Sequence, residues 1–171
     1  SPLIRANSGP SPGRSIASIA PGIGLVLSEV VADNREDPGV DAAFPDWVEI
    51  HNRSDRTIRL EGFSLTDDLE RADRWVFPPD LEMTPDEYLV VPFDSIHPAG
   101  PENTGFGLKS DGGAVYLFEL SGAQRVLVDS VEFGLQAPDW SIGRIPEGDA
   151  WTLGLTSPGL PNVSVPLGDP M

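Results

Sequence analysis

The 171-residue chain contains no cysteine. This absence excludes disulfide bridges and thiolate metal sites, and with them a structural zinc centre. It leaves the cellular compartment open, because a chain of this length buries roughly two thirds of its unfolded surface and is stable without covalent staples. The length and composition therefore predict one domain with tails, held together by an ordinary hydrophobic core.

Positive charge and long apolar runs are also scarce. Lys and Arg together number 11 against 27 Asp and Glu, which gives a formal net charge of -16 at pH 7. Nucleic acid is a poor partner for such a chain, because phosphate binding depends on Lys and Arg displacing condensed counterions. The same repulsion disfavours an anionic membrane surface, and no apolar run approaches the ~18 residues of a spanning helix. We expect neither nucleic-acid binding nor membrane insertion.

Turn-forming residues are abundant by contrast, with 18 glycines and 18 prolines beside 8% aromatic residues. Between the tails, apolar side chains recur with a period of two, which is typical of strands. Pro, Gly and Asp separate the apolar runs, and Ser121-Gly122-Ala123 supplies the positive-φ position of a tight hairpin. Strands are expected at residues 25–31, 47–52, 63–66, 74–77, 88–92, 114–119, 126–133 and 141–145. About seven to nine short strands at this spacing predict an all-β fold, an antiparallel β-sandwich.

The two ends of the chain differ in composition from this middle part. Residues 1–23 are rich in Pro, Gly and Ser and carry Arg5 and Arg14 as their only charges, which is typical of a flexible linker. The expected organisation is thus a linker at 1–23, a sandwich at 24–162 and a linker or tail at 163–171. Linkers on both sides suggest a module of a longer polypeptide.

A succession of short motifs resembles the lamin tail domain as bacteria use it. The first half carries Asp46-Trp47-Val48-Glu49-Ile50-His51-Asn52 and Gly62-Phe63-Ser64-Leu65-Thr66-Asp67-Asp68. The second half carries Asp129-Ser130-Val131-Glu132-Phe133-Gly134, Asp139-Trp140-Ser141-Ile142-Gly143-Arg144 and Ser157-Pro158-Gly159-Leu160-Pro161-Asn162. No single motif is strong, but their order is specific and covers about residues 24 to 162. The resemblance implies an immunoglobulin-like sandwich.

The resemblance also implies a function: a non-catalytic interaction or spacer module of a larger exported bacterial protein. Bacterial relatives are accessory domains of secreted or surface-attached proteins, so the implied location is extracellular or at the cell surface. The implied partners are a protein, a polysaccharide or neighbouring domains of the same polypeptide. The filament role of nuclear lamins is not carried over, because the chain has no heptad repeat. We expect no enzymatic activity.

Residues 33–46 form an acid-rich loop that departs from the family pattern. Asp33, Asp37, Asp41 and Asp46 could offer converging carboxylate oxygens of the kind that Ca²⁺ prefers. The spacing does not match an EF-hand, and the competing interpretation is a solvated loop whose Asp and Asn side chains cap their own backbone. Ca²⁺ is therefore the one cofactor under consideration. It would belong to the alternative function, a calcium-stabilised carbohydrate-binding module.

Carbohydrate binding would require exposed aromatic rings, and the chain has four tryptophans. Trp47, Trp75 and Trp140 fall in strand motifs, where packing in or near the core is the expected role. Trp151 lies in a turn-rich segment and is the best candidate for an exposed aromatic side chain. Trp151 and Trp140 are the candidate ligand-binding residues, and an exposed coplanar pair of tryptophans would favour the carbohydrate interpretation.

Glu29 and Glu49 stand in otherwise apolar strands, where a buried carboxylate requires a partner or a shifted pKa. Arg144 or Arg53 could supply that partner, or the acids could bind backbone amides. A third function class, a metal-dependent hydrolase, would require the acidic loop to converge with Glu49 and His51 on one cleft. No Gly-x-Ser-x-Gly motif frames a serine, so Ser-His-Asp chemistry is not supported.

Overall fold

A computed structural model describes residues 24–35, 44–146 and 149–164 of the chain. Apart from a short 3-10 helix, η2 at Leu69–Arg71, the regular structure in these residues is β-strand, which confirms the all-β class. The strands are β1 (Leu25–Val31), β2 (Asp46–Asn52), β3 (Ile58–Arg59), β4 (Phe63–Thr66), β5 (Trp75–Val76), β6 (Glu82–Met83), β7 (Tyr88–Phe93), β8 (Gly113–Ser121), β9 (Gln124–Phe133), β10 (Trp140–Arg144) and β11 (Trp151–Leu155).

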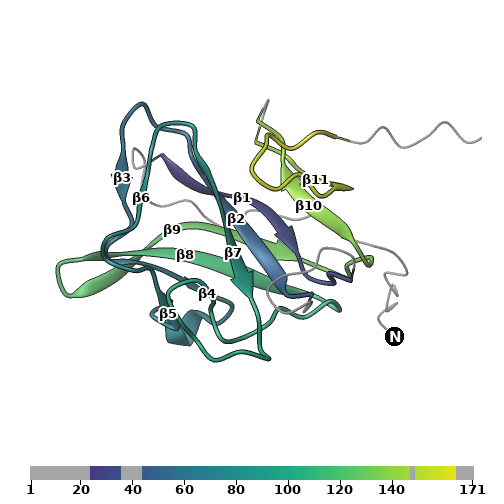
Figure 1. Ribbon diagram of the computed structural model, residues 1–171, viewed down its shortest axis with the longest axis horizontal. Helices are drawn as coiled ribbons and strands as arrows, with labels where there is room; N and C mark the ends of the chain where they lie inside the picture. The colour runs from purple at the N-terminus through teal and green to yellow at the C-terminus, as the bar shows by residue number, and fades with distance from the viewer. Residues whose placement is uncertain (1–23, 36–43, 147–148, 165–171) are drawn as a thin grey trace, which may run out of the picture.

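The strands form two main antiparallel sheets (Figure 1). The larger sheet has five strands in the order β11-β10-β1-β2-β7, and the smaller has four in the order β5-β4-β8-β9. A separate ribbon pairs β3 with β6. Strands β5 and β7 are thus edge strands, one in each main sheet, and no strand among the described residues pairs with their outer sides.

Eight of these strands lie where the alternation of apolar residues predicts them. The other three, β3, β6 and β11, bring the number in the described residues to eleven instead of the expected seven to nine. The two-residue strands β3 and β6 are too short for alternation to reveal. The hairpin β8–β9 turns at Gly122 and Ala123 as expected, with Gly122 at a φ of 62°.

The core fills the space between the two sheets. Alternate residues of β2 and β4 point into it, and Val48, Ile50 and Leu65 are fully buried. Leu117 of β8 meets them from the smaller sheet and is equally buried. Each such side chain contributes roughly 1.5–3 kcal/mol by leaving water, so this layer holds the sandwich together.

A bulge in β1 sets which side chains lie on the outer face of the larger sheet. The register against β2 shifts between Leu27 and Glu29, so that Leu27 pairs with Ile50 while Glu29 pairs with Glu49. An extra residue in one strand re-aims the side chains that follow it. The two glutamates therefore lie side by side on the face that points away from the core.

Candidate functional site

The acidic loop is described only in part, because Asp37 and Asp41 lie outside the described residues. Asp33 binds the Arg35 guanidinium, with 2.8 Å between Arg35 Nε and Asp33 Oδ1. Asp46 Oδ2 instead accepts the Leu108 N–H at 2.9 Å, and burial raises the pKa of Asp46. No group of three or more His, Asp or Glu suited to a metal ion forms among the described residues. The calcium site stays a prediction.

The two candidate tryptophans differ in exposure. Trp140, the first residue of β10, is 36% exposed beside its exposed cross-strand neighbour Leu155. Trp151 is buried, at 8% exposure, and the expectation that it is exposed was wrong. It begins β11 opposite Arg144, whose guanidinium carbon lies 4.9 Å from the centre of the indole ring. Trp47 and Trp75 are buried as expected, so the tryptophans do not form an exposed coplanar pair.

Glu29 and Glu49 are both fully buried. They bind backbone N–H groups, and not Arg144 or Arg53. Glu29 accepts the Ser157 N–H at 3.0 Å, and Glu49 accepts the Gly159 N–H at 2.6 Å. The pKa of Glu49 is raised to about 7, mainly because the carboxyl group is buried. Both carboxylates thus hold the segment that follows β11.

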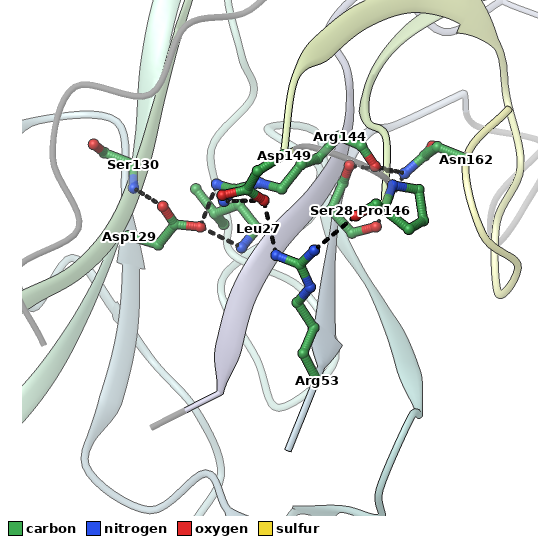
Figure 2. A network of polar contacts seen from close by, with 9 residues as sticks. All are labelled: Leu27, Ser28, Arg53, Asp129, Ser130, Arg144, Pro146, Asp149 and Asn162. Carbon is green, nitrogen blue, oxygen red and sulfur yellow. Dashed lines mark hydrogen bonds and ion pairs between the residues drawn. The ribbon is translucent and has the colours of Figure 1, made fainter. Parts of the chain in front are cut away.

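Arg144 is the centre of a different polar network, drawn in Figure 2. Its guanidinium reaches Asp129 Oδ2 of β9 at 2.5 Å and Asp149 Oδ1 at 3.2 Å. Asp129 also accepts the Leu27 N–H of β1 at 2.8 Å, and Arg53 binds Asp149 at 2.8 Å. Two cations, Arg144 and Arg53, therefore neutralise two anions, with the Arg144–Asp129 pair buried and Asp149 partly exposed. The network joins the two sheets and offers no free charge to a ligand.

The partners of His51 do not include Asp33 or Asp46, the two described acids of the loop. Its ring stacks on Tyr88 at a centroid distance of 3.9 Å, and its Nε2 lies 2.8 Å from Asp86 Oδ1. Burial lowers the pKa of His51. Glu49 is meanwhile covered by Gly159, so the described residues do not bring the acidic loop, Glu49 and His51 to one cleft.

The two edge strands border an apolar groove of about 480 Å³. Trp75 and Phe77 form one wall, in and beside β5, with their rings 4.7 Å apart in an edge-to-face arrangement. Leu89 and Val91 of β7 form the other wall. Pockets of this size, lined by aromatic and aliphatic side chains, are typical binding sites.

The loop that follows β7 borders the groove through Pro101 and Glu102. Trp75 Nε1–H donates to Gly100 O at 2.9 Å, and Thr104 N–H donates to Pro92 O at 3.1 Å. These bonds fix the loop against both edge strands and shape the groove before anything binds. Pro92 itself has no N–H to donate, which suits an edge position.

The charge around the groove is negative. Glu102 lines it and is exposed, and Asp80 is exposed between the lining residues Pro78 and Leu81 in sequence. An adjoining hollow of about 360 Å³ shares Pro101 and Glu102 with the groove and reaches Asp94. Burial alone would raise the pKa of Asp94, but hydrogen bonds from His97 and the Ile96 N–H lower it. No Lys or Arg lines either hollow in the part of the chain that the structure describes.

The groove has no local signature in the sequence. Its walls come from strands in different sheets, and the loop that borders it is held by a tryptophan 25 residues away. The available signal was the concentration of proline at 78, 79, 92, 98 and 101, which marks edges and loops without showing that they meet.

Two stacked antiparallel sheets with an apolar groove at their open edge define an immunoglobulin-like module. A family model for the Lamin Tail Domain matches residues 19–134, which span β1 to β9. This is more than half of the chain, so the chain belongs to the lamin tail domain family, a family of non-enzymatic immunoglobulin-like domains. A search of the curated proteins finds no match. Among the described residues, no helix has the length and apolar character needed to cross a membrane.

Proposed function

We propose that this chain is a non-catalytic interaction module that binds an extended peptide segment of a partner protein in the groove between β5 and β7. The observation that carries the proposal is the groove itself, an apolar channel of about 480 Å³ beside the edge of each main sheet. An extended segment can add its main chain to a free strand edge while alternate side chains enter an adjacent groove.

The chemistry of the groove indicates the composition of the partner segment. Its walls of Trp75, Leu89 and Val91 favour aliphatic or proline side chains. Glu102 at the mouth and Asp94 in the adjoining hollow favour Lys or Arg at the ends of the bound segment. The partner is therefore a segment with an apolar centre and basic flanks.

We also propose that the module works within a larger exported bacterial protein, at the cell surface or outside the cell. The support for this part is the resemblance of its motifs to bacterial lamin tail domains. In that setting the partner segment belongs to another surface protein or to a neighbouring domain. Fractionation of the source cells with an antibody against residues 24–162 tests the location.

Selection from a displayed library of random peptides, followed by NMR mapping, tests the binding function. We expect enriched peptides to combine apolar or proline residues with flanking Lys or Arg, because the groove is apolar and its rim is acidic. Titration of the best peptide into the labelled protein should shift the amide signals of Leu89, Val90, Val91 and Glu102. Binding should weaken at high salt, as expected for exposed charge pairs.

Two results would contradict the proposal. One is the absence of any enriched class of peptide. The other is a set of shifted signals centred elsewhere, for example around Trp140 and Leu155, which would assign binding to the exposed edge of the β10–β11 hairpin.

A further inference from the structure

The segment 157–162 crosses the outer face of the larger sheet and is held there by side chains distant in sequence. Ser157 N–H donates to Glu29 Oε1 of β1 at 3.0 Å. Gly159 N–H donates to Glu49 Oε2 of β2 at 2.6 Å. The segment belongs to no strand, so these side-chain hydrogen bonds attach it to the sheet in place of backbone pairing with a neighbouring strand. We call residues 157–162 the clasp segment.

The far end of the clasp segment is fixed by neutral groups. Asn162 Nδ2 donates to Ser28 O at 2.9 Å and to Arg144 O at 3.2 Å. Neither bond changes with pH, because an amide side chain and two backbone carbonyls do not titrate. Any pH dependence of the clasp segment must come from its other end, where Glu29 and Glu49 bind it.

Those two carboxyl groups are neighbours in a dry environment. Glu29 and Glu49 pair across β1 and β2, and both are 0% exposed. Side chains opposite each other in an antiparallel pair have Cβ atoms about 4.5–5.5 Å apart, so two negative charges there repel strongly. Glu49 Oε1 is moreover buried without a hydrogen-bond partner among the described residues. An ionised pair is costly in this arrangement.

The charged groups around the pair do not neutralise it. The polar and titratable groups packed on this face are Ser28, Ser141, His51, Tyr88, Arg53 and Arg144. His51 is bound to Asp86, and Arg144 is bound to Asp129 and Asp149. Arg53 is bound to Asp149 as well. The covering residues 155–164 contain no charged side chain.

We propose that Glu29 and Glu49 share a proton that keeps the clasp segment closed, and that loss of this proton releases the segment from the sheet. Opening lets water reach both carboxylates, and the proton leaves to solvent. The clasp segment is the element that moves, because backbone N–H groups of Ser157 and Gly159 bind it to the two glutamates and it is not paired with any strand.

The direction of the pH effect follows from the pKa of the closed form. Burial raises the pKa of Glu29, and it raises that of Glu49 from 4.5 to about 7. Closure therefore takes up a proton, and its stabilisation is fully present below about pH 4.5 and lost as the pH rises through about 7. Between these values the opening constant should rise about tenfold per pH unit and then level off.

Amide hydrogen exchange measured by NMR across this range tests the proposal. For the intact chain we expect the protection of Gly159 and Ser157, corrected for intrinsic rates, to fall about tenfold per pH unit and level off near pH 7. Protection of the core amide of Val48 should stay unchanged, which separates local opening from global unfolding. Glu49→Gln keeps an oxygen for the Gly159 N–H but cannot ionise, and it removes the charge that repels Glu29. The dependence of Gly159 protection on pH should therefore be much weaker than in the unsubstituted protein.

Two further variants sharpen the result. Glu29→Gln removes the neighbouring charge, so protection should level off at a lower pH than in the unsubstituted protein. Glu132→Gln, at an exposed position of β9, should leave the profile unchanged. If Glu49→Gln does not fold, the carboxyl carbon signal of Glu49 in the unsubstituted protein reports the same titration. Three results would each overturn the proposal. They are a protection of Gly159 that does not depend on pH, a profile in Glu49→Gln equal to that of the unsubstituted protein, and a Glu49 carboxyl group that titrates near its ordinary pKa.

Discussion

Asn162 of the clasp segment packs closely against Gly143 of β10. A Cβ atom at Gly143 would lie 2.4 Å from Asn162 Oδ1 and 2.6 Å from its Cγ. Glycine is required here because the Asn162 side chain packs flat on the strand and donates to the carbonyl groups of Ser28 and Arg144. Because Gly143 has no side chain, the buried amide group of Asn162 can hold the clasp segment against the sheet.

Gly143→Ala should therefore destabilise the protein by about 2 kcal/mol, since it displaces Asn162 and breaks its hydrogen bonds. Urea unfolding followed by tryptophan fluorescence measures the change. Gly100→Ala is the control, because no atom lies within 4 Å of the position its Cβ would take. In an Asn162→Ala background the Gly143→Ala substitution should cost little. An equal cost in both backgrounds would show that the close approach is not the cause.

The β10–β11 hairpin is attached to the rest of the domain by a buried ion pair. Arg144 at the end of β10 is bound to Asp129 of β9, and the side chains are 5% and 1% exposed. Asp129 in turn accepts the Leu27 N–H of β1. The side chain of Asp129 thereby connects the hairpin, the central strand of the larger sheet and the edge of the smaller sheet (Figure 2).

Arg144→Met should destabilise the protein by about 3–5 kcal/mol, because it leaves the Asp129 carboxylate buried without its cation. Adding Asp129→Asn should recover part of the loss, since asparagine is neutral and keeps an oxygen for the Leu27 N–H. Arg53→Met removes a half-exposed partner of Asp149 and should cost less than about 1 kcal/mol. Denaturant unfolding of the four proteins gives these values. Equal losses in Arg144→Met and Arg53→Met would contradict the assigned role of the buried pair.

The elements show where sequence alone is sufficient and where it fails. Alternation predicted β2 and β4 because one face of each meets the core, and local residues decide that. The expectation of an exposed Trp151 rested on its turn-rich segment and was wrong, because Arg144, which covers the ring, lies across a turn and is itself fixed by Asp129. The groove at β5 and β7 depends on how two sheets meet, which no local pattern encodes.

At the scale of the whole molecule, several of the few positive charges in the described residues pair with carboxylates. Arg35, Arg53 and Arg74 bind Asp33, Asp149 and Asp67 respectively, and Arg59 lies near Glu61 and Glu82. The net charge of -16 therefore belongs to an exterior with little cationic surface to offset it. Such a field attracts basic partners from a distance and repels acidic ones. The electrostatic field brings a basic partner close, and the groove then supplies apolar contact with it.

Calorimetric titration of the best selected basic peptide against charge-reversal variants tests this account most directly. Glu102→Lys reverses the charge at the groove mouth and should weaken binding by about threefold to tenfold, as expected for a partly exposed charge pair. Glu132→Lys makes the same change in net charge at an exposed position of β9 and should stay within about twofold of the unsubstituted protein. Undiminished binding by Glu102→Lys, or equal weakening by both variants, would contradict recognition in the groove.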